Sequence, residues 1–74
     1  MRAPARPAVA AVAARMLEVL PELMVAERRY RGVTQRQCAE QVGYGESSLC
    51  RFERGQLFVS LPVAVRMLRW IGER

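Results

Sequence analysis

The apolar residues of this chain fall into spacings that predict a series of short helices. The first set recurs every three or four positions and consists of Val9, Val12, Ala13, Met16 and Leu20. This spacing predicts an amphipathic helix over residues 8–20. Pro21 is expected to end or kink that helix, or to serve as an early residue of the next one. The next helix is predicted from Glu22 to Arg31, with Gly32 as its left-handed cap.

The central segment carries clear signals for a helix start and a tight turn. Thr34 can cap a helix, and Gln37, three residues later, can complete a capping box, so a helix is predicted from Gln35 to Val42. Gly43 is expected to take the left-handed turn that ends it. The inward face of this helix is predicted to hold Cys38, Ala39 and Val42. Small Ala39 would let a second helix cross closely at a steep angle.

A second short helix is predicted directly after the turn. Gly45 can serve as a permissive start, the helix runs from about Glu46 to Arg54, and Gly55 stops it. Leu49 and Phe52 are expected on its buried side, which leaves its polar side chains facing outward.

The last predicted helix is apolar on two sides. Ser60 is a cap residue and Pro62 lies in the first turn of a helix that runs to about Ile71. The expected core face consists of Leu61, Val65, Leu68 and Ile71, and a second apolar stripe consists of Val63, Met67 and Trp70. A helix with two apolar sides usually has two packing partners.

Composition and charge narrow the function classes. A chain of 74 residues is a single domain with a small core, for which support from a partner subunit would be unsurprising. Arginine supplies all 12 basic residues and glutamate all 7 acidic ones, which indicates GC-rich coding. The net charge of +5 suits a polyanionic partner, because arginine can hold phosphate and read guanine. Charge alone does not separate this interpretation from a merely soluble basic protein.

Other classes receive little support from the sequence. Cys38 and Cys50 are the only cysteines and histidine is absent, so no structural zinc site is expected and both thiols are predicted to be reduced. No apolar run is long enough for a membrane span, and Arg15 and Glu18 interrupt the stretch that imitates a signal peptide. With no paired nucleophile and base, we expect no enzyme, no cofactor and no small-molecule ligand.

Eight residues of the central segment match a known motif in register and without insertion: Thr34, Gln35, Ala39, Gly43, Leu49, Phe52, Glu53 and Gly55. On these residues the segment resembles the Cro/CI-type (XRE-like) helix-turn-helix family of phage and bacterial repressors. The likeness continues to Ser60, Leu61 and Gly72, so it covers about residues 20–72.

The resemblance implies a site on the second helix of the motif, which lies in the major groove of DNA in this family. The matching positions for contact with base edges are Gly45, Glu46, Ser47, Ser48 and Arg51. Arg51 is the best candidate for specificity, because its fork matches two acceptors of guanine, a contact worth about 1 to 3 kcal/mol. Glu46 either accepts from cytosine or only favours the positive helix end. Contacts with the DNA backbone are assigned to Gln35, Arg36, Arg54 and Gln56.

The resemblance also implies a structural ion pair. In the family, the acid at the position of Glu53 pairs with an arginine on the preceding helix, and the matching residue is Arg28. We expect this pair to be partly buried.

The chain departs from the family pattern outside the motif. The residues after Gly55 are apolar, and an additional helix precedes the family-like region. Either residues 8–20 fold back over Trp70 within one subunit, or a two-fold dimer interface is formed by Leu57, Phe58, Met67 and Trp70. We favour the dimer for Leu57 and Phe58 and the folded-back helix for part of the Trp70 stripe. Residues 1–7 are predicted to form a disordered arm. We favour a frayed terminus, and the alternative is an arm that reaches DNA.

Together these features predict an all-α domain over residues 1–74. It would be a compact bundle of about five short helices of the lambda-repressor-like type, with an extra N-terminal helix. The expected function is a sequence-specific regulator of transcription, a Cro-like phage repressor that binds a palindromic operator in double-stranded DNA as a homodimer in the bacterial cytoplasm. The alternative is a small antitoxin, or another interaction module, that binds a partner protein as well as DNA.

Overall fold

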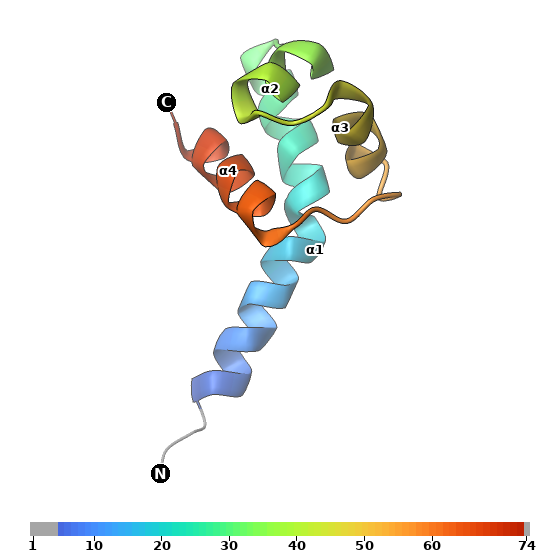
Figure 1. Ribbon diagram of the computed structural model, residues 1–74. Helices are drawn as coiled ribbons and strands as arrows, with labels where there is room; N and C mark the ends of the chain where they lie inside the picture. The colour runs from blue at the N-terminus through green and yellow to red at the C-terminus, as the bar shows by residue number, and fades with distance from the viewer. Residues whose placement is uncertain (1–4, 74) are drawn as a thin grey trace.

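A computed structural model describes residues 5–73 of the chain, with side chains from Ala8 onward. The described residues form four helices and no strand (Figure 1): α1 (Ala5–Arg31), α2 (Gln35–Val42), α3 (Glu46–Glu53) and α4 (Leu61–Gly72). The all-α class was predicted correctly, but the expected number of about five helices was too high by one.

The count differs because α1 is continuous through Pro21. A proline inside a helix removes one backbone hydrogen bond and costs about 3 kcal/mol. Leu20 and Met24, on either side of it, are buried in the core, and their packing offsets this cost. The prediction that the helix ends or begins at Pro21 was therefore wrong.

The helix α1 begins inside the segment that was predicted to be a disordered arm. Residues 5–7 belong to the first turn of α1, and residues 1–4 lie outside the described part of the chain. Pro7 fits this first turn, because the first four backbone N–H groups of a helix have no intrahelical acceptor.

The two halves of α1 have different surroundings. From about Leu20 onward the helix packs against α3 and α4, whereas its first half projects away from the other helices (Figure 1). A straight continuation of α1 cannot turn back over Trp70. The predicted fold-back of residues 8–20 was thus wrong. None of the described helices is both long enough and apolar enough to cross a lipid bilayer.

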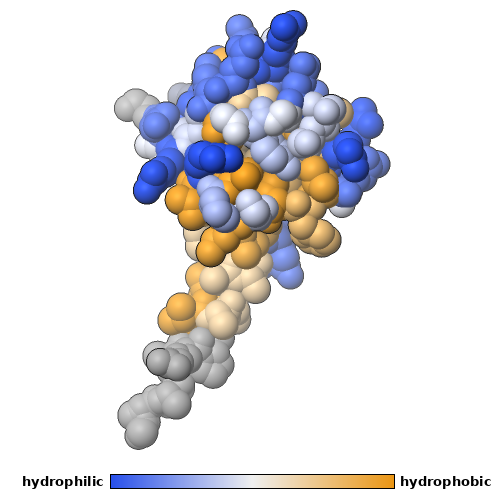
Figure 2. All heavy atoms as spheres, viewed as in Figure 1, coloured by the Kyte–Doolittle hydropathy of each residue, from blue (hydrophilic) through white to orange (hydrophobic). Residues whose placement is uncertain are grey.

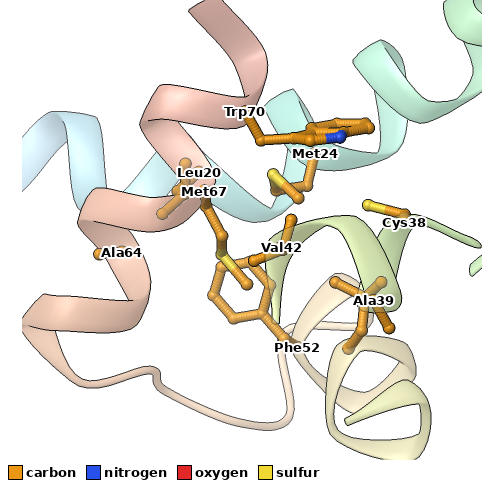
Figure 3. Close-up of a cluster of buried hydrophobic side chains, with 10 residues drawn as sticks. Leu20, Met24, Cys38, Ala39, Val42, Phe52, Ala64, Met67 and Trp70 are labelled. Carbon is orange, nitrogen blue, oxygen red and sulfur yellow. The ribbon is translucent and has the colours of Figure 1, made fainter. Parts of the chain in front are cut away.

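All four helices contribute to one hydrophobic core (Figure 3). Its buried members are Leu20, Met24, Cys38, Ala39, Val42, Leu49, Phe52, Ala64, Met67 and Trp70. The predicted inward residues of α2 and α3 are all among them. Burial of each larger side chain stabilises the fold by about 1.5 to 3 kcal/mol.

The core face of α4 differs from the predicted one. Leu61 is 69% exposed and Val65 is also exposed, whereas Ala64, Met67 and Trp70 are buried. Leu68 and Ile71 are half-buried against the core, so this part of the prediction was correct. The small side chain of Ala64 faces the core. The larger apolar side chains next to it in the sequence lie on the two flanks of the helix.

This orientation removes two residues from the predicted dimer interface. Met67 and Trp70 lie inside the subunit and present no surface to a second copy. Leu57 is half-buried, and only Phe58, which is 98% exposed, lies fully open in the loop before α4. The predicted four-residue interface therefore does not exist as a surface patch.

Trp70 is held by polar partners that the sequence did not indicate. Its Nε1 donates to Oε1 of Gln41 at 2.7 Å, and the Arg31 guanidinium lies 4.0 Å from the ring centroid. Arg31 also pairs with buried Glu27 (Nε to Oε2, 2.8 Å) and donates to the carbonyls of Trp70 and Glu73 at the end of α4. One arginine thus links α1 to the C-terminal end of α4 through backbone carbonyls and the Trp70 ring.

Candidate nucleic-acid interface

The start of α2 and the turn after it fix the position of α3. Gln37 N donates to Thr34 Oγ1 at 3.1 Å and Thr34 N donates to Gln37 Oε1 at 2.8 Å, which confirms the predicted capping box. Gly43 has a φ of 80°, and its N–H donates to the Ala39 carbonyl at 2.9 Å. The left-handed turn was therefore predicted correctly. It sets the angle at which α3 leaves α2.

A polar stripe of α3 faces solvent. Ser47, Arg51 and Arg54 are exposed and follow one another at helical spacing, while Leu49 and Phe52 on the opposite side are buried. Within the described residues, neither Arg51 nor Arg54 forms an ion pair through its side chain. Both guanidinium groups are therefore available to an anionic or hydrogen-bonding partner.

The other residues predicted to contact bases lie around the start of α3. Gly45 is its N-terminal cap residue, with φ −73° and ψ 142°, so its position does not require the conformational freedom of glycine. Glu46 is exposed in the first turn, where either of its two predicted roles is sterically open. Ser48 is half-buried and presents less surface than Ser47.

The four residues predicted to contact the DNA backbone differ in their availability. Arg36 is exposed, and its Nε lies 4.0 Å from Oε2 of Glu40. This ion pair is solvent-exposed and restrains the Arg36 side chain only weakly. Arg54 and Gln56 are exposed just beyond α3. Gln35 is half-buried, and its Nε2 donates to Glu53 Oε1 at 2.9 Å. The side chain of Gln35 thus has a structural partner inside the chain, which its predicted role did not include.

The predicted ion pair between Arg28 and Glu53 is present and bidentate. Arg28 Nε and Nη2 each donate to one carboxylate oxygen of Glu53 at 3.0 Å. Only 16% of the Arg28 side chain and 5% of the Glu53 side chain are exposed. The hydrogen bond with Glu53 raises the pKa of Arg28 above its ordinary value. With Gln35 as a further donor, α1 and α2 both hold the end of α3 through one carboxylate.

The predicted thiol chemistry agrees with the structure. Cys38 and Cys50 are free thiols, the first buried and the second half-buried. Burial raises the pKa of Cys38 to about 11, and the charge of Glu53 adds to this effect. Cys38 is therefore a neutral core residue at ordinary pH.

Polar and apolar surfaces are separated along the molecule. Figure 2 shows hydrophilic residues around the end that carries α2, and apolar residues toward the projecting half of α1.

Comparison with known proteins supports the geometric reading of α2 and α3. A family model described as a helix-turn-helix domain matches residues 22–72, well over half of the chain. No curated protein and no solved structure gave a significant match. The matched region begins within α1 and ends with α4, so it contains every buried core residue except Leu20. The chain thus belongs to the helix-turn-helix family of DNA-binding domains, with α2 and α3 as the two helices of the motif.

Proposed function

We propose that this chain is a sequence-specific regulator of transcription, a small Cro-like repressor of phage or bacterial origin. It acts in the cytoplasm of a bacterial host as a homodimer on a palindromic operator, and it has no catalytic activity. The observation that carries the proposal is the outward stripe of α3, which presents Ser47, Arg51 and Arg54 to solvent without partners in the described chain.

The proposed reading places α3 in the major groove of double-stranded DNA. Arg51 donates two hydrogen bonds to the O6 and N7 atoms of guanine, and Ser47, one turn earlier, contacts a neighbouring base. Arg36 lies at the start of α2, before α3 in the chain, and Arg54 and Gln56 lie just beyond the end of α3. These side chains contact phosphates and set the register of α3 without reading sequence.

Repression follows from occupancy of the operator. In this proposal the bound chain blocks access of the polymerase to DNA, with affinity set by phosphate contacts and selectivity set by Arg51.

Two arginine variants separate these roles. Arg36→Ala should weaken binding to all duplexes similarly and lower the slope of log affinity against log salt by about one unit. Arg51→Ala should cost about 1 to 3 kcal/mol on the preferred duplex and little on random duplexes. Arg15→Ala removes the same charge from the projecting half of α1 and should change neither. Fluorescence anisotropy across a salt series measures all three, and equal losses for Arg51→Ala on all duplexes would refute the assignment.

A second candidate function is a small antitoxin or interaction module that binds a protein as well as DNA. The exposed apolar residues, Phe58 and those of the projecting half of α1, favour it. Stable co-purification with the product of a neighbouring gene would support this alternative.

A further inference from the structure

The projecting half of α1 carries an apolar face that no part of the described chain covers. Val9 and Val12 are 65% and 61% exposed, and Met16 and Leu17 are about half exposed. Together with Ala8 and Ala13 these side chains form one side of the helix. Apolar faces of this length are normally buried against a partner.

This apolar face continues the core-facing side of the same helix. Leu20 and Met24, which are buried against α3 and α4, follow Ala13, Met16 and Leu17 at spacings of three and four residues. The charged residues Arg15, Glu18 and Glu22 lie on the other side of the helix, where Arg15 and Glu18 form an exposed pair at 3.8 Å. One side of the projecting half of α1 is thus charged and suited to solvent, and the other side is apolar and suited to contact with a partner.

The face leads into an apolar groove between α1 and α4. Four residues of α1 line it together with two of α4: Ala13, Met16, Leu17, Leu20, Leu61 and Leu68. This explains the exposure of Leu61, which the sequence placed in the core. Each molecule therefore carries both a projecting apolar helix and a groove lined by the same kind of side chain.

We propose that the occupant is a second copy of this chain. Two copies related by a two-fold axis lay the projecting halves of α1 antiparallel along each other, so that each helix reaches the groove beside Leu61 and Leu68 of its partner. Such a contact is self-complementary, because each copy supplies one helix and one groove. Small Ala8 and Ala13 allow the two helices to approach closely. The proposal deepens the proposed function and rests on it for the choice of a two-fold partner.

The available surface matches the needs of a small dimer. Residues 8–19 of α1 extend over roughly 18 Å, and one side of a helix of that length and of about 11 Å diameter offers roughly 300 Å². The groove residues Leu61 and Leu68 of α4 add to this area and bring it toward about 600 Å² per partner, the lower end of the range for stable interfaces. The contact also leaves α3 free, because α1 projects away from the motif (Figure 1).

A matched pair of charge insertions tests the interface on the full chain. Val12→Glu places a carboxylate on the apolar face, and Ala11→Glu places the same group on the charged side, one turn before Arg15. Size-exclusion chromatography with light scattering should show a dimer for the native chain at tens of micromolar. Val12→Glu should weaken dimerisation by at least tenfold, and Ala11→Glu should leave it unchanged. A monomeric native chain, or equal dimerisation of both variants, would overturn the proposal.

Two further measurements keep this result separate from the proposed function. Thermal melts should show that Val12→Glu folds as the native chain does, because Val12 lies outside the core. Val12→Glu should also retain binding to a short random duplex, which depends on α3 and its neighbours. A dimer through α1 without DNA binding would refute the proposed function and leave the interface standing. DNA binding by a native monomer would refute the interface, together with the homodimer of the proposed function, and leave the DNA-reading role of α3 standing.

Discussion

Glu53 links α1 and α2 to the end of α3. Its carboxylate accepts two hydrogen bonds from the Arg28 guanidinium and one from the side-chain amide of Gln35. The carboxylate is almost entirely shielded from water. A buried carboxylate keeps its charge only with such partners. The acid that follows Phe52 on α3 is therefore a structural residue, and its charge is held inside the fold.

Loss of this charge should destabilise the fold. We expect Glu53→Gln to lower the free energy of unfolding by about 3 kcal/mol, because it leaves the Arg28 charge largely buried without a counter-ion. Glu40→Gln, which removes an exposed carboxylate 4.0 Å from Arg36, should change it by less than about 0.5 kcal/mol. Chemical denaturation of the three proteins provides the comparison. Equal stabilities for Glu53→Gln and the native chain would show that the pair is not structural.

Cys38 makes stability depend on pH in the alkaline range. The thiol titrates with a pKa of about 11 in the folded chain and at the ordinary value of 9.0 when unfolded. Its contribution to stability is complete below pH 9 and is lost as the pH rises toward 11, because only the unfolded state releases the proton there.

A comparison with Cys38→Ala isolates this contribution. Between pH 8 and pH 10 the native chain should lose about 1 kcal/mol more stability than Cys38→Ala, since each pKa unit corresponds to about 1.4 kcal/mol. Urea denaturation at the two pH values measures the difference. Parallel losses in both proteins would mean that the thiol titrates equally in the folded and unfolded states.

Among the elements, α1 departs most from the pattern of short helices. It combines a buried half, which anchors the motif, with an exposed apolar half, and Pro21 lies near the boundary between them. The missing N–H of Pro21 leaves one carbonyl of the preceding turn without its helical donor.

Replacement of Pro21 should therefore strengthen α1. We expect Pro21→Ala to raise the free energy of unfolding by about 1 to 3 kcal/mol, because it restores the backbone hydrogen bond and removes the steric conflict of the ring. Circular dichroism melts test this, with Ala26→Pro, at an exposed position of the same helix, expected to destabilise by a similar amount. A lower melting temperature for Pro21→Ala would indicate that the proline ring itself is needed for packing.

The sequence determined the motif well because its signals are local. The capping box at Thr34, the left-handed Gly43 and the inward Ala39 each depend on a few neighbouring residues, and all three appear as predicted. The pair between Arg28 and Glu53 is distant in sequence and was predicted only through the family resemblance. The prediction of a helix boundary at Pro21 was wrong because tertiary packing outweighed the local preference of proline.

The periodicity of the sequence does not predict which side of α4 faces the core. Its sequence is apolar on two sides, so the choice between Leu61 and Met67 as a core residue depended on helix contacts that the pattern does not contain. The role of Arg31 was equally hidden, because it contacts the end of α4 through backbone carbonyls, which leave no trace in side-chain spacing, as well as through the Trp70 ring.

In the whole molecule, the proposed reading of DNA, attraction to DNA and assembly of two copies belong to different parts of the chain. The segment from Thr34 to Gly55 has no net charge, because Arg36, Arg51 and Arg54 offset Glu40, Glu46 and Glu53. The net charge of +5 therefore comes from the flanking residues, and we propose that they add to the attraction to DNA without specifying a sequence. The exposed half of α1 lies away from the motif and is free to join two copies.

Selection of binding sites from a library of random duplex DNA tests the central claim most directly. We expect the native chain to enrich one palindromic site, with two half-sites separated by about one helical turn, roughly 34 Å. We also expect Arg51→Ala to lose the preference at one base pair in each half-site. If no common sequence is enriched, or if Arg51→Ala selects the same bases as the native chain, α3 is not the sequence-reading helix that we propose.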